Sequence, residues 1–157
     1  MRATRPSKPD AGLLEELFPP RRIPASQIGG VGPEVGAYMD DFGGRAWTEV
    51  DDWPYQLHTD AYCLMDPKTL VHYIPGFMRL ALSDDSPGNV FPADEYLVYF
   101  AASELFVDFC RLLTVRQIEF VIQVVDFFIH HEYFSDDERV PYGANRAELV
   151  QDLHEKS

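Results

Sequence analysis

The residues best suited to chemistry lie together late in the chain, where Asp126 is followed by His130, His131 and Glu132. On a helix, an aspartate and a histidine four residues apart share one face, so this pair can hold a divalent metal if other segments complete the coordination. Polar residues also end helices, and histidine suits the negative end of the helix dipole. We therefore expect no metal and keep a metal-dependent enzyme as an alternative hypothesis.

Other catalytic chemistry lacks a pattern in this sequence. A serine or cysteine nucleophile needs a base and a sharp turn, and no G-x-S-x-G segment occurs. Cys63 and Cys110 stand among apolar neighbours, which is typical of reduced thiols in a core, and a disulfide is the less favoured alternative. The glycines of "GGVG" lack the strand and lysine of a phosphate-binding loop. We predict no enzyme activity and no cofactor.

Charge is the most unusual property of the chain. Its 26 acidic and 13 basic residues give a formal net charge of −13. From Glu34 to Asp66 the acidic residues are opposed only by Arg45. Such a surface repels nucleic acid and anionic membranes and speeds encounter with a basic protein, so we predict a basic protein partner, no nucleic acid and no membrane. The alternative is that the acidic excess only maintains solubility.

Several acidic residues occur as adjacent pairs, and we predict that these pairs converge on one face that binds the partner. An aromatic residue within such a face often anchors an interface. We expect Trp47 and Trp53 in the core and Tyr55 at the surface. The candidate partner-binding residues are Asp40, Asp41, Asp51, Asp52, Tyr55, Asp60, Asp84 and Asp85.

Hydrophobic spacing predicts an all-α fold, a single helical domain over residues 11–157 that follows a flexible N-terminal arm over residues 1–10. No apolar run approaches the roughly 18 residues that span a bilayer. The N-terminal residues do not resemble a secretory signal, so we expect a cytoplasmic protein. Its oligomeric state is left open.

The first half of the chain predicts short helices and one longer one. Short helices are expected over residues 11–17, capped by Asp10, and over residues 33–42. Two short segments should follow, with Pro54 interrupting the pattern. Asp66 and Pro67 begin a helix over residues 67–82, in which Pro75 should produce a kink.

The second half predicts a central antiparallel hairpin of two long helices, over residues 93–113 and 115–133. Thr114 and Gln117 form a capping box at the start of the second helix, and two apolar strips on that helix indicate that it is covered on two sides. Residues 134–147 read as a polar loop. A short terminal helix should begin near Asn145.

The segment "LMDPKTLVHYIPGFM" at residues 64–78 resembles the "LTPEAFRYYLPAFL"-type helix and proline motif of a family of small, acidic bacterial proteins. Trp47 upstream and "LLTVRQ" at residues 112–117 downstream extend the resemblance to about residues 45–130. Leu70 and His72 replace the phenylalanine and first tyrosine of the motif. The resemblance implies an architecture and no activity. More loosely, the chain resembles bacterial toxin-immunity proteins.

These observations lead to one functional hypothesis. The chain is expected to be a non-catalytic, acidic protein-binding module, most concretely an immunity or antitoxin-like inhibitor that neutralises a basic toxin by covering its active site. The alternatives are the metal-dependent enzyme described above and a structural protein that self-associates.

Overall fold

The computed structural model describes residues 6–83, 93–131 and 134–156, and this part of the chain is all-α, as predicted. The helices are α1 (Leu14–Leu17), α2 (Val35–Phe42), α3 (Asp52–Leu57), α4 (Ala61–Leu64), α5 (Pro67–Leu82), α6 (Ala93–Ala101), α7 (Phe106–Cys110), α8 (Val115–His131) and α9 (Asp136–Lys156). Three 3-10 turns are η1 (Ala11–Leu13), η2 (Ala25–Gln27) and η3 (Trp47–Glu49). None of the described helices is long and apolar enough to cross a membrane.

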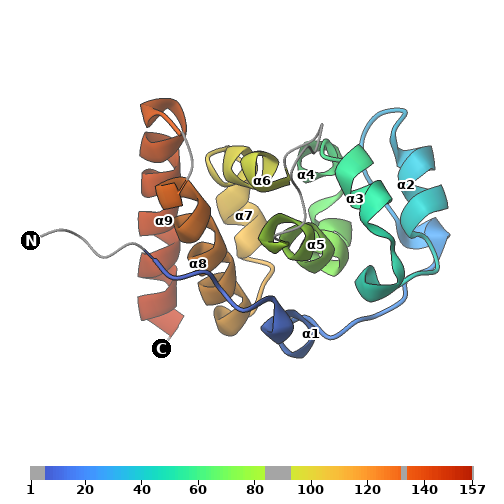
Figure 1. Cartoon of the computed structure of the whole chain (residues 1–157). Coiled ribbons are helices and arrows are strands. Elements are labelled where there is room, and N and C mark those ends of the chain that lie inside the picture. The colour runs from blue at the N-terminus through green and yellow to red at the C-terminus, as the bar shows by residue number, and fades with distance from the viewer. Residues whose placement is uncertain (1–5, 84–92, 132–133, 157) are drawn as a thin grey trace, which may run out of the picture.

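The helices form a body with α8 and α9 at one end, α5 and α6 in the middle, and α2 and α3 at the other end (Figure 1). Helix α8 packs against α6 and α9, which confirms that it is covered on two sides. Helix α5 packs against α3, α6, α7, η1 and η3. The prediction that residues 115–133 form the centre of the domain is therefore wrong, because α5 contacts more of the fold.

Helix α5 begins as its sequence predicts. The Asp66 carboxylate accepts a hydrogen bond of 3.2 Å from the backbone N–H of Lys68, and Pro67 occupies the first helical position. The helix continues through Pro75 to Leu82, and both Pro75 and Gly76 are buried. The proline therefore does not end the helix, because its position is enclosed by packing.

Gly76 has the closest neighbouring side chain among the described glycines. A Cβ atom at this position would overlap the ring and hydroxyl of Tyr55. The Tyr55 ring also meets Phe77 edge-on at 4.8 Å, and its hydroxyl donates to the carbonyl of Trp47 at 2.8 Å. Tyr55 is fully buried, so the prediction that it anchors a partner at the surface is wrong. Its ring instead fills the space that glycine leaves on α5.

The two tryptophans lie in different environments. Trp47 is buried, as predicted, and its indole N–H donates to the carbonyl of Phe18 at 2.8 Å. Trp53 is 60% exposed, which contradicts its predicted place in the core. Trp53 and Tyr55 are two residues apart on α3, so they point to different sides of a helix, and Tyr55 takes the side that faces α5.

The predicted single helix over residues 93–113 is wrong. The chain breaks between α6 and α7, where the Ser103 hydroxyl donates to the carbonyl of Phe100 at 2.7 Å and accepts from the N–H of Leu105 at 3.3 Å. These local bonds compete with the helical pattern. The side-chain amide of Asn145 on α9 donates to the carbonyls of Ala101 and Ser103, each at 2.9 Å. The first arm of the predicted hairpin therefore consists of two helices, α6 and α7. The carbonyls of Ala101 and Ser103 at the break between them accept hydrogen bonds from α9.

The predicted polar loop over residues 134–147 is also wrong, because α9 begins at Asp136. Ser135 starts it: its hydroxyl accepts from the N–H of Asp137 at 3.2 Å, and the Glu138 carboxylate accepts from the N–H of Ser135 at 3.1 Å. Ser135 is therefore the N-cap of α9, and Glu138 reaches back to its backbone N–H and hydroxyl. Tyr142 is buried against α8, and this packing lets α9 continue past Pro141.

Other local signals are confirmed. Asp10 caps the first turn by accepting from the N–H of Gly12 at 2.8 Å. Thr114 and Gln117 form the predicted capping box at the start of α8, with hydrogen bonds of 2.9 and 3.2 Å. Pro54 lies inside α3, so the predicted interruption at this residue is wrong, and the chain here forms η3, α3 and α4 in place of the two expected segments. Residues 1–5 of the predicted N-terminal arm lie outside the described residues, and residues 6–10 have no helix.

The close approach at Gly76 predicts an unusual response to alanine. Gly76→Ala should lower the free energy of unfolding by about 1–3 kcal/mol through overpacking against Tyr55, although alanine is the better helix former. Gly143→Ala is the matched control, since it lies in α9 with open space around it and should raise the free energy of unfolding by about 0.5–1 kcal/mol. Urea unfolding measures both, and equal effects of the two substitutions would contradict the packing described.

Candidate binding site at the acidic end

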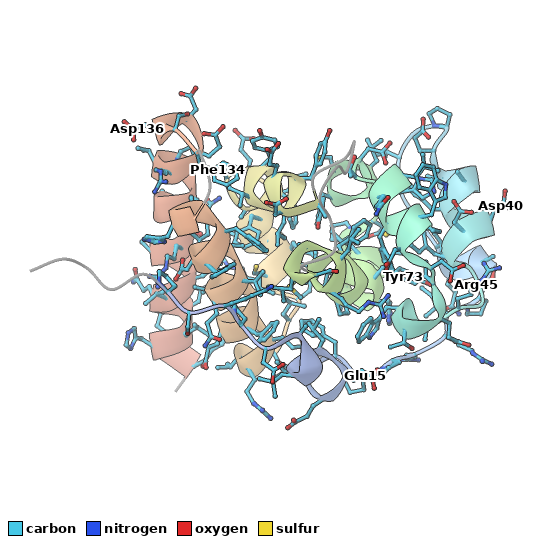
Figure 2. The ribbon with its side chains drawn as sticks, in the orientation of Figure 1. Glu15, Asp40, Arg45, Tyr73, Phe134 and Asp136 are labelled. Carbon is cyan, nitrogen blue, oxygen red and sulfur yellow. The ribbon has the colours of Figure 1, made fainter. Side chains whose placement is uncertain are left out.

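Four carboxylates meet at the α2 and α3 end of the molecule. Asp40 and Asp41 lie in the last turn of α2, Glu49 lies in η3, and Asp51 precedes α3. We call these four residues the acidic end. With Arg45 they line a hollow of about 190 Å³. Figure 2 shows Asp40 and Arg45 at this end, on the side of the molecule opposite α9.

The segment between α2 and α3 is held from inside the core by two tyrosine hydroxyls. The Tyr73 hydroxyl lies 2.9 Å from the carbonyl oxygen of Phe42 and 3.0 Å from that of Arg45. Burial raises the pKa of Tyr73 to about 12, so the hydroxyl stays a donor at neutral pH. The Tyr55 hydroxyl bonds to Trp47 within η3. The backbone that carries Glu49 and Asp51 is therefore fixed by the packing around α5.

Two of the four carboxylates are engaged within the chain. Glu49 forms two hydrogen bonds with the Arg22 guanidinium, of 2.6 and 2.7 Å, and accepts from the backbone N–H of Ala46 at 2.9 Å. The Arg22 hydrogen bond, followed by that from Ala46, lowers the pKa of Glu49 to about 2. Asp41 contacts Nε2 of the buried His58 at 2.5 Å. These contacts fix η3 and α2 in place.

The other two carboxylates, those of Asp40 and Asp51, have no hydrogen bond or ion pair within the described residues. Arg45 does not neutralise them by direct contact, because its guanidinium donates to the backbone carbonyls of Asp40 and Asp41, at 2.9 and 3.2 Å. Four carboxylates against the guanidinium groups of Arg22 and Arg45 leave a net charge of −2 with His58 counted as neutral. Asp40 and Asp51 are therefore free to pair with a cationic group of another molecule.

The remaining predicted site residues are distributed differently. Asp52 approaches Arg79 at 3.8 Å, a weak surface pair. Asp60 accepts a hydrogen bond of 2.8 Å from the hydroxyl of Tyr38. Asp84 and Asp85 lie outside the described residues. The structure therefore brings together Asp40, Asp41 and Asp51, and it adds Glu49, which sequence reasoning missed.

Trp53 is the second residue that sequence reasoning missed. It lies in the first turn of α3, two residues after Asp51, and its indole is largely exposed. Leu57, one turn further along α3, is 45% exposed. Residues four apart share a helix face, so Trp53 and Leu57 form a small apolar surface next to Asp51. This spacing is visible in the sequence, but it does not reveal which side of α3 meets the core.

Of the candidate metal ligands at and after Asp126, Glu132 and the side chain of His131 lie outside the described residues, and the described ones are engaged within the chain. The Asp126 carboxylate accepts hydrogen bonds from the Arg146 guanidinium at 3.0 and 3.1 Å and from the Tyr142 hydroxyl at 2.7 Å. The guanidinium charge beside this carboxylate repels a cation. His130 places Nδ1 2.7 Å from the backbone carbonyl of Asp126. Within the described residues no group of three His, Cys, Asp or Glu side chains is placed to hold a metal ion.

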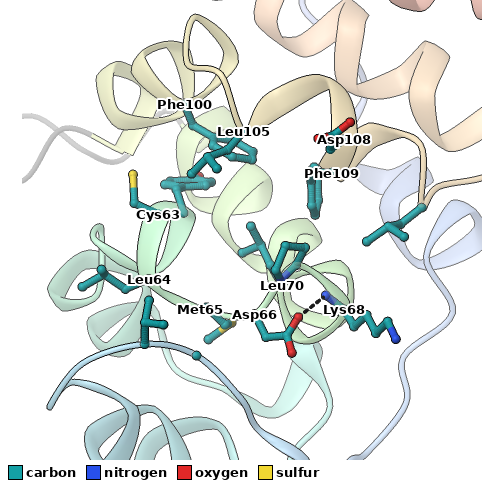
Figure 3. A pocket seen from close by; sticks show the side chains of 15 residues that line it. Cys63, Leu64, Met65, Asp66, Lys68, Leu70, Phe100, Leu105, Asp108 and Phe109 are labelled. Carbon is teal, nitrogen blue, oxygen red and sulfur yellow. Dashed lines mark hydrogen bonds between the residues drawn. The ribbon is translucent and has the colours of Figure 1, made fainter.

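A separate apolar cavity of about 570 Å³ lies among α4, the start of α5, α7 and the backbone of Gly30 and Val31 (Figure 3). Backbone bonds from Val31 to Leu64 and from Asp66 to Gly29, each of 2.8 Å, attach this segment to the α4–α5 junction. Cys63 lines the cavity and is exposed, which corrects its predicted place in the core. Cys110 is buried as predicted, and burial raises the pKa of its thiol.

Comparison of the chain with protein-family models, with curated proteins and with solved structures gives no match. The resemblance of residues 64–78 to small acidic bacterial proteins therefore stays a prediction.

The lowered pKa of Glu49 predicts a pH-dependent stability. Its folded pKa of about 2 lies below the ordinary value of 4.5, so the ionised carboxylate stabilises the fold above 4.5 and loses this effect as pH falls toward 2. Glu49→Gln should be less stable than the natural chain at neutral pH, and the difference should narrow through that window. Urea midpoints at a series of pH values measure it, and a constant difference would contradict the assignment.

Proposed function

We propose that this chain is a non-catalytic binding module whose acidic end receives a basic segment of a protein partner. The observation that carries the proposal is the pair of unengaged carboxylates, Asp40 and Asp51, beside one hollow in a segment fixed from the core. Fixed charges attract a partner without the entropy cost of ordering a loop on binding. The net charge of −13 adds long-range attraction toward a basic surface.

Trp53 supplies the apolar contact in this proposal. Tryptophan is among the residues that most often dominate binding energy, and its ring face attracts lysine and arginine through cation–π contact. An exposed indole two residues along the chain from the free carboxylate of Asp51 suits a segment in which basic side chains alternate with apolar ones. Leu57, one turn further along α3 and 45% exposed, extends the apolar part of this surface.

The concrete form of the proposal is an immunity or antitoxin-like inhibitor that covers the basic active site of a toxin. Support comes from the acidic end, from the acidic excess over the whole chain, and from the loose resemblance to immunity proteins. An inhibitor of this kind needs only a rigid complementary surface. The test partner is the protein encoded by the neighbouring gene.

Charge removal tests the location of the site. The double substitution Asp40→Asn with Asp51→Asn should slow association with that partner about tenfold at low salt and reduce the salt dependence of the rate. The matched control removes the same charge from α9, at the far end of the molecule, by Asp137→Asn with Glu155→Gln. Stopped-flow association measures both. An equal loss in the two double variants would place the effect in the net charge and contradict a localised site.

Removing the indole tests the anchor. Trp53→Ala should cost about 2 kcal/mol of binding free energy, a rise in Kd of about 30-fold, mainly through faster dissociation. Because Trp53 is exposed, the substitution should leave the stability of the free chain nearly unchanged. Titration calorimetry gives the affinity and urea unfolding gives the stability. Unchanged affinity would remove Trp53 from the interface, and absence of any salt-sensitive complex would remove the inhibitor proposal.

A further inference from the structure

The apolar cavity beside α4 and α7 is separate from the acidic end and has the size of a small-molecule site. Its volume of about 570 Å³ falls within the range of roughly 300–1,000 Å³ that such sites occupy. Aromatic and aliphatic side chains form most of its lining, which includes Tyr62, Leu70, Phe100 and Phe109. Val31, Leu105 and Leu112 lie at the cavity too and are each 47–64% exposed. A ligand with an apolar body would remove this apolar surface from water.

Tyr62 is an unusual member of the lining. Its ring stacks on Phe100 at 5.0 Å, and the side chain is 95% buried. Within the described residues its hydroxyl is the one buried side-chain polar atom that has no hydrogen-bond partner. Burial raises the pKa of this hydroxyl, so it stays a donor. A buried unpaired donor is costly, and a ligand that carries an acceptor relieves that cost.

The charged groups at the cavity are not equally engaged. Asp66 caps α5 by accepting from the N–H of Lys68, and Asp108 pairs with Arg111 at 3.4 Å. The Lys68 ammonium has no ion pair within the described residues. Figure 3 shows Asp66 and Lys68 together at one side of the cavity, with Phe100, Leu105 and Phe109 across from them. Lys68 also lies in the first turn of the 16-residue α5, where the helix dipole is positive.

From this arrangement we propose that the cavity binds a small amphipathic carboxylate, a molecule with an alkyl or aryl body and one carboxylate group. The body occupies the space between Leu70, Phe100 and Phe109, and the carboxylate pairs with Lys68. The Lys68 ammonium and the Tyr62 hydroxyl are donors and a carboxylate only accepts, while the Asp66 carboxylate beside them already accepts from the N–H of Lys68. The proposal does not depend on the acidic end or on a protein partner.

A chain-length and head-group series tests the chemistry. Hexanoate, octanoate and decanoate, each below its micelle concentration, should bind with affinity rising about fourfold per added methylene. Octanol and octylamine carry the same body as octanoate and should bind more weakly. Titration calorimetry measures the series. No binding at millimolar concentration, no dependence on chain length, or octylamine binding as tightly as octanoate would overturn the proposal.

Lysine substitution tests the partner of the carboxylate. Lys68→Gln should weaken octanoate about threefold, as expected for an exposed ion pair, and leave octanol unchanged. Lys156→Gln, at the exposed end of α9, removes the same charge and should change neither. Equal effects of the two lysine substitutions on octanoate would overturn the assignment of Lys68.

Cys63 reports whether the ligand occupies this cavity. It is exposed and lines the cavity, whereas Cys110 is buried, so the fast reaction with a thiol reagent belongs to Cys63. Octanoate should slow that reaction in proportion to its occupancy, and octylamine at the same concentration should slow it less. Leu105→Glu, at an exposed position, should reduce both octanoate binding and the protection of Cys63. Octanoate binding without protection of Cys63 would place the ligand elsewhere and overturn the proposal.

Discussion

The fold depends on one close contact, the ring of Tyr55 lying directly on the backbone of α5 at Gly76. This contact brings α3 against α5 and buries the tyrosine hydroxyl where it can bond to Trp47 in η3. Tyr73, on the same helix as Gly76, holds the turn after α2 in the same way. The acidic end is therefore positioned by hydroxyl groups that reach outward from the core, and two of its four carboxylates, Asp40 and Asp51, are free for other contacts.

Local chemistry made part of this fold predictable. Asp66 before Pro67, and Thr114 before Gln117, mark helix starts through bonds between neighbours in the sequence, and both starts are confirmed. The break between α6 and α7 was not predictable from spacing, because the carbonyls it frees bond to Asn145, more than forty residues later in the chain. Long-range partners of this kind are invisible to periodicity.

The sequence predicted the acidic character of the candidate site, but it did not predict which of its side chains are exposed or paired. The clustering of Asp40, Asp41 and Asp51 follows from their positions at the facing ends of two short helices, α2 and α3, which are joined by residues 43–51 with η3 among them. The exchange of Trp53 and Tyr55 between surface and core was missed, since it depends on which side of a two-turn helix meets α5. Counting acidic residues also overstated the available charge: Glu49 and Asp126 are bound by arginines of the same chain.

Helix α9 has a consequence for the order in which the protein is made. It follows every other described helix in the chain, yet it supplies the amide that satisfies the carbonyls between α6 and α7, and Glu148 and Asp152 on it pair with Arg111. A nascent chain still on the ribosome would hold those carbonyls and the surface under Leu149 open to water until α9 emerges. Cooperative folding of the earlier helices is then delayed until α9 has left the ribosome and can pack against them.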